Sequence, residues 1–92
     1  MRDFYEALFK TGEYYLYVQH TADDPEYDFD YTFYDKDFND VDGGVIGRHT
    51  NWDLTRAARE IVSGEIAYGL KAVGLNIVRL DMDKLYSSKV YL

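Results

Sequence analysis

The chain has 92 residues, among them ten Tyr, five Phe and no Cys, and carries a net charge of −7. This length fits one domain over residues 1–92, and the absence of Cys excludes disulfides, thiolate metal sites and a thiol nucleophile. The negative charge argues against non-specific binding to nucleic acid or anionic lipid, and no apolar run reaches the roughly 18 residues that a membrane span needs.

Two elements are predicted before residue 21. Phe4 and Leu8 recur at helical spacing, so residues 2–10 predict a short helix, with Gly12 in the position where glycine closes a helix. Residues 13–20 are rich in Tyr, Leu and Val and predict a strand. Alternation divides its side chains between two faces: Tyr14, Leu16 and Val18 on one, and Tyr15, Tyr17 and Gln19 on the other.

Two further strands follow a loop at residues 21–26, which contains the one proline. Residues 27–34 alternate between two faces, one carrying Tyr27, Phe29, Tyr31 and Phe33 and the other carrying Asp28, Asp30, Thr32 and Tyr34. A turn at 35–37 leads into a third strand from Phe38 to about Ile46. Within it, Gly43-Gly44 predicts a bulge or a strand end with positive φ.

A long helix is predicted over residues 52–73, capped by Thr50 or Asn51. Its buried stripe comprises Leu54, Ala57, Ala58, Ile61, Val62, Ile66, Leu70 and Val73. Gly64 and Gly69 weaken a helix, so one helix kinked near Gly64 and two shorter helices both stay open. Residues 75–81 predict a fourth strand, and residues 87–92 predict either a last short strand or a frayed tail.

The predicted fold class is α+β. It comprises a short N-terminal helix, a three-stranded antiparallel sheet, a long helix that is straight or kinked, and one or two further C-terminal strands. We expect Leu54, Ala58, Ile61 and Leu70 to pack on the sheet face that carries Phe29, Tyr31 and Phe33, because a stripe of period 3.6 fits a strand face of period 2.

One segment holds essentially all of the net charge. Residues 23–42 contain nine Asp or Glu and one cation, Lys36, and therefore carry −8. Residues 1–22 carry −1 and residues 43–92 carry +2. Six aromatic rings are interleaved with the nine acids, and alternation along a strand can turn rings inward and carboxylates outward. We therefore expect a concentrated anionic surface.

Known catalytic and metal-binding patterns do not fit the sequence. Asp35-x-Asp37-x-Asn39 begins like a calcium loop, but the sixth and twelfth positions hold Asp40 and Ile46 instead of Gly and Glu. The two histidines form no helical pair for a metal, and no Ser lies in a nucleophile elbow. We expect no enzyme, no cofactor and no specific metal site, with a weak calcium site at Asp35, Asp37, Asp40 and Asp42 as an alternative.

Three resemblances bear on function. The order helix, three strands, helix resembles the double-stranded-RNA-binding domain, but that family needs basic residues that contact phosphates, which the acidic segment opposes. In size, charge and ring content the whole chain resembles phage and plasmid inhibitors of CRISPR nucleases and restriction enzymes. Residues 15–19 (YLYVQ), 31–35 (YTFYD) and 42–44 (DGG), within a span of 12–65, resemble accessory domains of large polyvalent proteins in mobile elements of gut Firmicutes. The last two imply mobile DNA and a bacterial host.

The predicted function is non-enzymatic inhibition of a defence nuclease by DNA mimicry. The partner would be a basic nucleic-acid-binding protein, such as a CRISPR or restriction nuclease, with no direct contact to nucleic acid or membrane. The predicted contact residues are Asp24, Glu26, Asp28, Asp30, Asp35, Asp37, Asp40 and Asp42, with Tyr15, Tyr17, Tyr27 and Tyr34 as aromatic anchors.

Two alternatives to mimicry stay open. One is a structural protein-interaction module of a mobile element, and the other is a weak calcium- or metal-binding domain. The start of the chain does not resemble a signal peptide, so we expect a cytoplasmic location.

Overall fold

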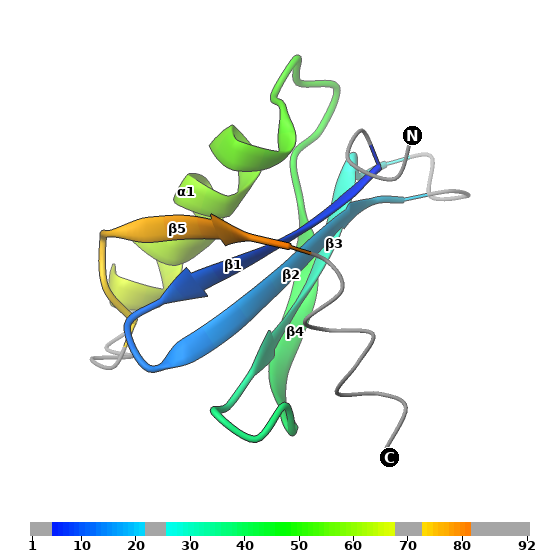
Figure 1. The fold of residues 1–92 in the computed structure, drawn as a ribbon. Coiled ribbons are helices and arrows are strands. Elements are labelled where there is room, and N and C mark those ends of the chain that lie inside the picture. Colours follow the sequence, from blue (N-terminus) through cyan, green and yellow to red (C-terminus); the bar gives the residue numbers. More distant parts are fainter. Residues whose placement is uncertain (1–4, 22–25, 68–72, 82–92) are drawn as a thin grey trace.

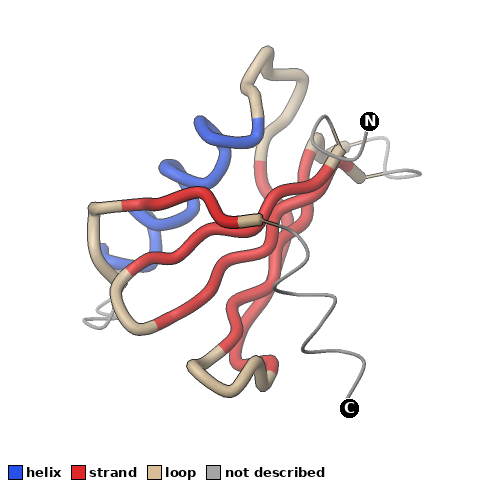
Figure 2. Tube along the Cα trace, viewed as in Figure 1, coloured by secondary structure: helices blue, strands red, loops and turns tan. Residues whose placement is uncertain are grey.

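The computed structural model describes residues 5–21, 26–67 and 73–81. In chain order the elements are β1 (Glu6–Thr11), β2 (Tyr14–His20), β3 (Phe29–Tyr34), β4 (Asp40–Ile46), α1 (Leu54–Ala67) and β5 (Ile77–Leu80). The strands form one antiparallel sheet in the order β4-β3-β2-β1-β5, with α1 against one face (Figures 1 and 2). β4 and β5 are therefore the two edges of the described sheet. No helix in these ranges is long and apolar enough to cross a membrane.

The predicted fold class is wrong at the N-terminus and in the number of strands. Residues 6–11 form a strand between β2 and β5, not a helix. Ala7 and Phe9 are buried on the α1 side and Leu8 is buried on the opposite side. A strand buried on both faces reads as a continuous apolar run, which periodicity cannot distinguish from a short helix. Gly12 does not close a helix; with φ 58° it begins the two-residue turn between β1 and β2.

The predicted facing of the central strands is confirmed. The core beneath α1 contains Leu16, Val18, Phe29 and Phe33, with Tyr14 and Tyr31 packed against it. Tyr15, Tyr17 and Tyr34 lie on the opposite face, around Leu8 and Phe38. This second cluster makes the sheet apolar on both faces along β1 and β2.

The predicted helical stripe is also confirmed as far as Val62. Leu54, Ala57, Ala58, Ile61 and Val62 are all buried in the core. Ile66, however, is exposed, so the prediction that the stripe continues there is wrong. Leu70 and the predicted last strand at residues 87–92 lie outside the described residues.

The start of the predicted long helix needs correction, whereas its interior and the predicted fourth strand do not. The N–H of Arg56 donates to Oδ1 of Asp53 at 2.7 Å, so Asp53 caps α1, not Thr50 or Asn51. Gly64 lies inside α1 without interrupting it. The predicted fourth strand at residues 75–81 is present as β5 and pairs with β1.

Gly43 and Gly44 of β4 allow close packing against Tyr31, and neither adopts the positive φ that the sequence predicted. Gly43 and Gly44 lie within the strand and neither has a positive φ, while the irregular pairing falls at Val41. A Cβ atom on Gly43 would lie 2.9 Å from the carbonyl oxygen of Tyr31, and one on Gly44 would lie 2.9 Å from the Tyr31 hydroxyl oxygen. Gly43 therefore needs glycine because its close contact is with the backbone, whereas a side chain at Gly44 would require the Tyr31 ring to move.

Candidate functional site

The predicted acidic residues do not all share one surface. Two of them use their carboxylates inside the fold. Asp28 accepts hydrogen bonds from the backbone N–H of Thr50 at 2.8 Å and from its hydroxyl at 2.7 Å. Asp30 accepts a hydrogen bond from Nε2 of Gln19 at 2.9 Å. These two acids connect parts of the structure and are poorly placed to meet a partner.

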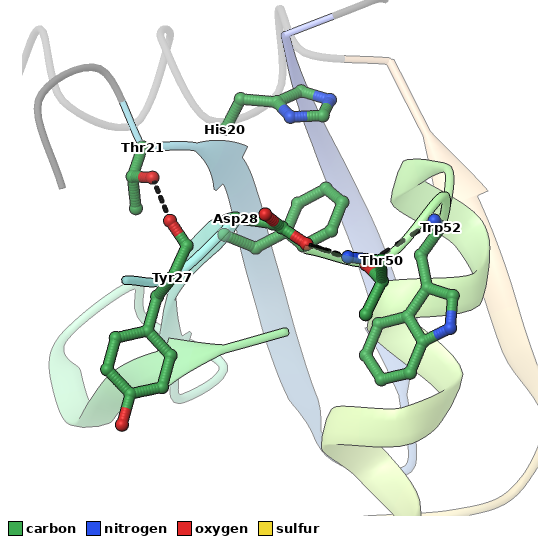
Figure 3. Close-up of a pocket in the computed structure, with 7 residues that line it drawn as sticks. His20, Thr21, Tyr27, Asp28, Thr50 and Trp52 are labelled. Atoms are coloured by element: carbon green, nitrogen blue, oxygen red, sulfur yellow. Dashed lines mark hydrogen bonds between the residues drawn. The ribbon is translucent and has the colours of Figure 1, made fainter. Parts of the chain in front are cut away.

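A shallow pocket of about 290 Å³ surrounds Asp28 (Figure 3). Its lining is formed by His20, Thr21, Tyr27, Asp28, Phe29, Thr50 and Trp52. The hydroxyl of Thr50 is the main cause that lowers the pKa of Asp28, followed by the Thr50 N–H. The hydroxyl of Thr21 donates to the Tyr27 carbonyl at 2.5 Å. These bonds join the adjoining ends of β2 and β3 to the segment that leads into α1, so the pocket is a structural joint.

Asp35 organises the turn between β3 and β4. Its Oδ1 accepts hydrogen bonds from the N–H groups of Asp37 and Asn39, both at 2.9 Å, and its Oδ2 accepts one from Nδ2 of Asn39 at 3.3 Å. These bonds, first the one from the Asn39 N–H, lower the pKa of Asp35. The described residues contain no group of three or more His, Cys, Asp or Glu arranged to hold a metal ion.

The acids that face solvent are concentrated at the end and outer edge of the hairpin. Asp37 lies in the turn, and Asp40 and Asp42 lie on β4; all three are exposed. We call these three residues the acidic hairpin. Of the other predicted contacts, Glu26 is exposed, and Asp24 lies outside the described residues.

Asp42 forms a carboxyl pair with Glu65 of α1. Burial and the negative charge of Asp42, which also hydrogen bonds to Glu65, raise the pKa of Glu65. Burial, Glu65 and Asp42 together raise the pKa of the neighbouring Tyr31 hydroxyl. Within the described ranges no Lys, Arg or His forms an ion pair with either carboxylate. Among residues 5–21, 26–67 and 73–81, no cation is therefore paired with this negative charge beside β4.

Three of the four predicted tyrosine anchors lie together, on the sheet face opposite α1. The Tyr15 ring stacks on Phe38 with 4.2 Å between ring centroids, and the Tyr34 ring lies 6.0 Å from Phe38. Tyr17 hydrogen bonds through its hydroxyl to Glu6 at 2.6 Å. Tyr27 is separate from them, at the pocket around Asp28.

Sequence reasoning missed two features of this region. Phe38 has a positive φ of 61° and is buried, so the turn residue that looked like the start of a strand anchors the tyrosine face. A lone aromatic residue within an acidic turn was the available signal. The second feature is that β4 is an edge of the described sheet, which no local pattern reveals because it depends on the strand order.

The fold and the exposed acids define a small α+β domain with an acidic sheet edge. The chain belongs to the family described as large polyvalent protein-associated domain 16, which matches residues 4–89. The predicted resemblance to accessory domains of large polyvalent proteins is thereby confirmed and extends over nearly the whole chain. Comparison with curated proteins and with solved structures gives no match. The resemblance to inhibitors of CRISPR and restriction enzymes stays a prediction.

Proposed function

We propose that this domain is a non-enzymatic protein-interaction module whose acidic hairpin binds a basic surface of a partner protein. The observation that carries the proposal is the exposure of Asp37, Asp40 and Asp42 in the segment that holds a charge of −8. Family membership supports an interaction role, because the family consists of domains associated with larger proteins.

The β3–β4 hairpin is already ordered before a partner binds, so it loses little conformational entropy on binding. Asp35 holds the turn with hydrogen bonds to Asp37 and Asn39, and β4 is paired with β3 along its length. A surface that is already ordered loses less conformational entropy when a partner binds. Exposed carboxylates also accelerate association with a basic surface, and this contribution weakens as salt is added.

The narrower hypothesis is that the basic surface is the nucleic-acid groove of a defence nuclease. The charge of the segment supports it as a second candidate. Asp28, Asp30 and Asp35, however, are half-buried and use carboxylate oxygens in internal hydrogen bonds, so they contribute less to a row of phosphate-like charges. Asp42 also accepts a hydrogen bond, from the Gly43 N–H, but it is exposed. A DNA mimic on this fold would therefore rely on the acidic hairpin.

A capture experiment with charge-matched variants tests the proposal. D37N/D40N/D42N removes the three acids, whereas N51K/S63K/N76K adds the same three units of charge at exposed positions elsewhere, so both variants carry −4 instead of −7. Immobilised protein would be mixed with bacterial lysate at low and high salt, and bound proteins would be quantified by mass spectrometry. We expect the wild type and the lysine variant to retain a partner that the acidic-hairpin variant loses and that high salt removes.

Two outcomes separate the hypotheses. Equal capture by D37N/D40N/D42N and wild type would contradict the proposal, as would equal loss from both variants. Duplex DNA added as a competitor distinguishes the narrower hypothesis, because a mimic and DNA occupy the same groove. If DNA does not displace the partner, mimicry is wrong and the interaction module stands.

A further inference from the structure

The hydrogen bonds of the neighbouring strands show which residues of β4 point their N–H and C=O groups toward β3 and which point them outward. Residues of an antiparallel strand bond alternately to the neighbour on one side and the neighbour on the other. Asp28, which precedes β3, does not decide this alternation, because its carbonyl accepts from the Thr21 N–H at 3.0 Å while its own N–H donates to the Gly47 carbonyl at 2.9 Å. The bond from the His20 N–H to the Tyr5 carbonyl, at 2.8 Å, assigns the even-numbered residues of β2 to β1, so its odd-numbered residues bond to the even-numbered residues of β3. The bond from the Asp35 N–H to the Asn39 carbonyl, at 2.9 Å, agrees with this at the other end of β3. The odd-numbered residues of β3 therefore bond to β4.

The outward-facing groups of β4 are then those of Gly43 and Val45. The odd-numbered residues of β3 are in register with Asp42, Gly44 and Ile46, so these three bond inward. The hydrogen bond from the Gly43 N–H to Oδ1 of Asp42, at 2.8 Å, agrees with this assignment, because an N–H bonded to β3 would not need that partner. The outer edge from Asp42 to Ile46 thus presents the Val45 N–H and the carbonyls of Gly43 and Val45 to an added strand, while the Gly43 N–H is held by Asp42.

The two faces beside this edge differ in chemistry. On the α1 side lies the carboxyl pair of Asp42 and Glu65, which no Lys, Arg or His of the described ranges meets in an ion pair. On the opposite face, Val45 is 45% exposed and Gly43 contributes no side chain. Successive side chains of an added strand point to alternate faces, so one set would meet carboxylates and the other set would meet Val45.

We infer that the partner binds through an extended segment that adds to the outer edge of β4, with cationic side chains toward Asp42 and Glu65 and apolar side chains toward Val45. This inference rests on the proposed function and adds the mode of binding and the chemistry of the partner. The backbone bonds of the added strand supply affinity, and the alternation of Lys or Arg with apolar residues supplies specificity.

A second copy of this chain is a poor occupant of the same edge. Pairing of β4 with β4 would bring Asp40 and Asp42 of one copy close to those of the other. Acids on an edge strand, together with the irregular pairing at Val41, are devices that prevent sheets from joining edge to edge. The edge of β4 therefore repels the same edge of a second copy and attracts a strand that carries cationic side chains.

The test uses a short, end-blocked peptide that alternates Lys and Val, titrated into ¹⁵N-labelled protein. Val45→Pro removes the outward N–H without removing a bond to β3, and Val45→Ala is the matched control that keeps the N–H. We expect binding by the wild type and by Val45→Ala within about twofold of each other, and binding about tenfold weaker by Val45→Pro, since a backbone hydrogen bond is lost and the ring blocks approach. The Val45 amide of the wild type should also exchange about tenfold more slowly with peptide bound.

A second probe changes only the peptide, which keeps the test valid if Val45→Pro does not fold. N-methyl groups on the peptide residues that face β4 remove its donors, and a peptide with the same residues in one block of Lys and one block of Val removes the alternation. Both should bind about tenfold more weakly than the alternating peptide. Equal binding by the methylated or block peptide would overturn strand addition.

The remaining outcomes separate this inference from the proposed function. If the methylated peptide binds as well as its parent but D37N/D40N/D42N weakens both, the acidic hairpin is a docking surface without strand addition. If the charge variant binds every peptide as the wild type does, both proposals are wrong. A dimer in analytical ultracentrifugation that Val45→Pro abolishes would make a second copy the occupant and would also overturn the inference.

Discussion

Replacement of Ile61 by Ala tests how α1 is attached to the sheet. Ile61 is 3% exposed and lies in the core cluster with Phe29 and Phe33. The substitution removes three buried carbon atoms, which at about 0.8 kcal/mol each corresponds to about 2.4 kcal/mol of transfer free energy. The cavity left behind adds to this cost, while the better helix propensity of Ala offsets about 0.4 kcal/mol. We expect the free energy of unfolding to fall by about 3 kcal/mol, a large share of the stability of so small a domain.

Urea denaturation followed by circular dichroism measures this loss. Ile66→Ala is the matched control, since Ile66 lies on the same helix and is 36% exposed. We expect the urea midpoint to fall for Ile61→Ala with an unchanged m value, and the free energy of unfolding of Ile66→Ala to stay within about 1 kcal/mol of the wild type. Equal effects of the two substitutions, or a loss below about 0.5 kcal/mol for Ile61→Ala, would refute the packing of α1 described above.

Three further predictions follow from individual residues. Gly64→Ala should stabilise the protein by about 0.5–1 kcal/mol, because a Cβ there meets no atom within 4 Å. Gly47→Ala should destabilise it by about 1–2 kcal/mol, because Gly47 has a φ of +84°. Melting temperatures of the two variants that shift in the same direction would contradict this pair of predictions. The lowered pKa of Asp28 means that its hydrogen bonds to Thr50 stabilise the fold above about pH 4 and that this stability is lost as the pH falls through the lowered value. Thr50→Val should therefore narrow the difference in unfolding free energy between neutral and acid pH, and an unchanged difference would show that the bonds do not matter. Calorimetry with Ca²⁺ should show no saturable micromolar binding, since the spacing after Asp35 departs from the calcium loop; saturable binding that Asp35→Asn abolishes would establish the metal-binding alternative.

The parts of the fold that the sequence predicts are those with a clear period. The alternation along β3 and the stripe from Leu54 to Val62 each have one apolar face, and both faces were predicted correctly. β1 was predicted incorrectly because Ala7, Leu8 and Phe9 are buried on both sides of a sheet whose outer strand, β5, comes from the other end of the chain. No local window contains that pairing, and an apolar run of this length fits a helix as well as a strand.

The candidate site shows the same division between local and long-range information. The sequence located the acidic segment correctly, but it could not tell Asp28 from Asp42. Asp28 is engaged by Thr50, which lies 22 residues away, whereas Asp42 lies on an edge. Hydrogen bonds between distant residues and the order of strands in the sheet decide which carboxylates can reach a partner, and neither is encoded by spacing alone.

The central claim, that the acidic hairpin and the β4 edge bind the partner, is tested most directly by residue-level hydrogen exchange of the domain in complex with its captured partner. Amide exchange reports protection at each backbone position, so it distinguishes this edge from every other described surface. We predict that protection gained on binding is concentrated between Asp37 and Ile46 and includes the Val45 amide. Protection gained along α1 or β5, with none in β4, would contradict the claim.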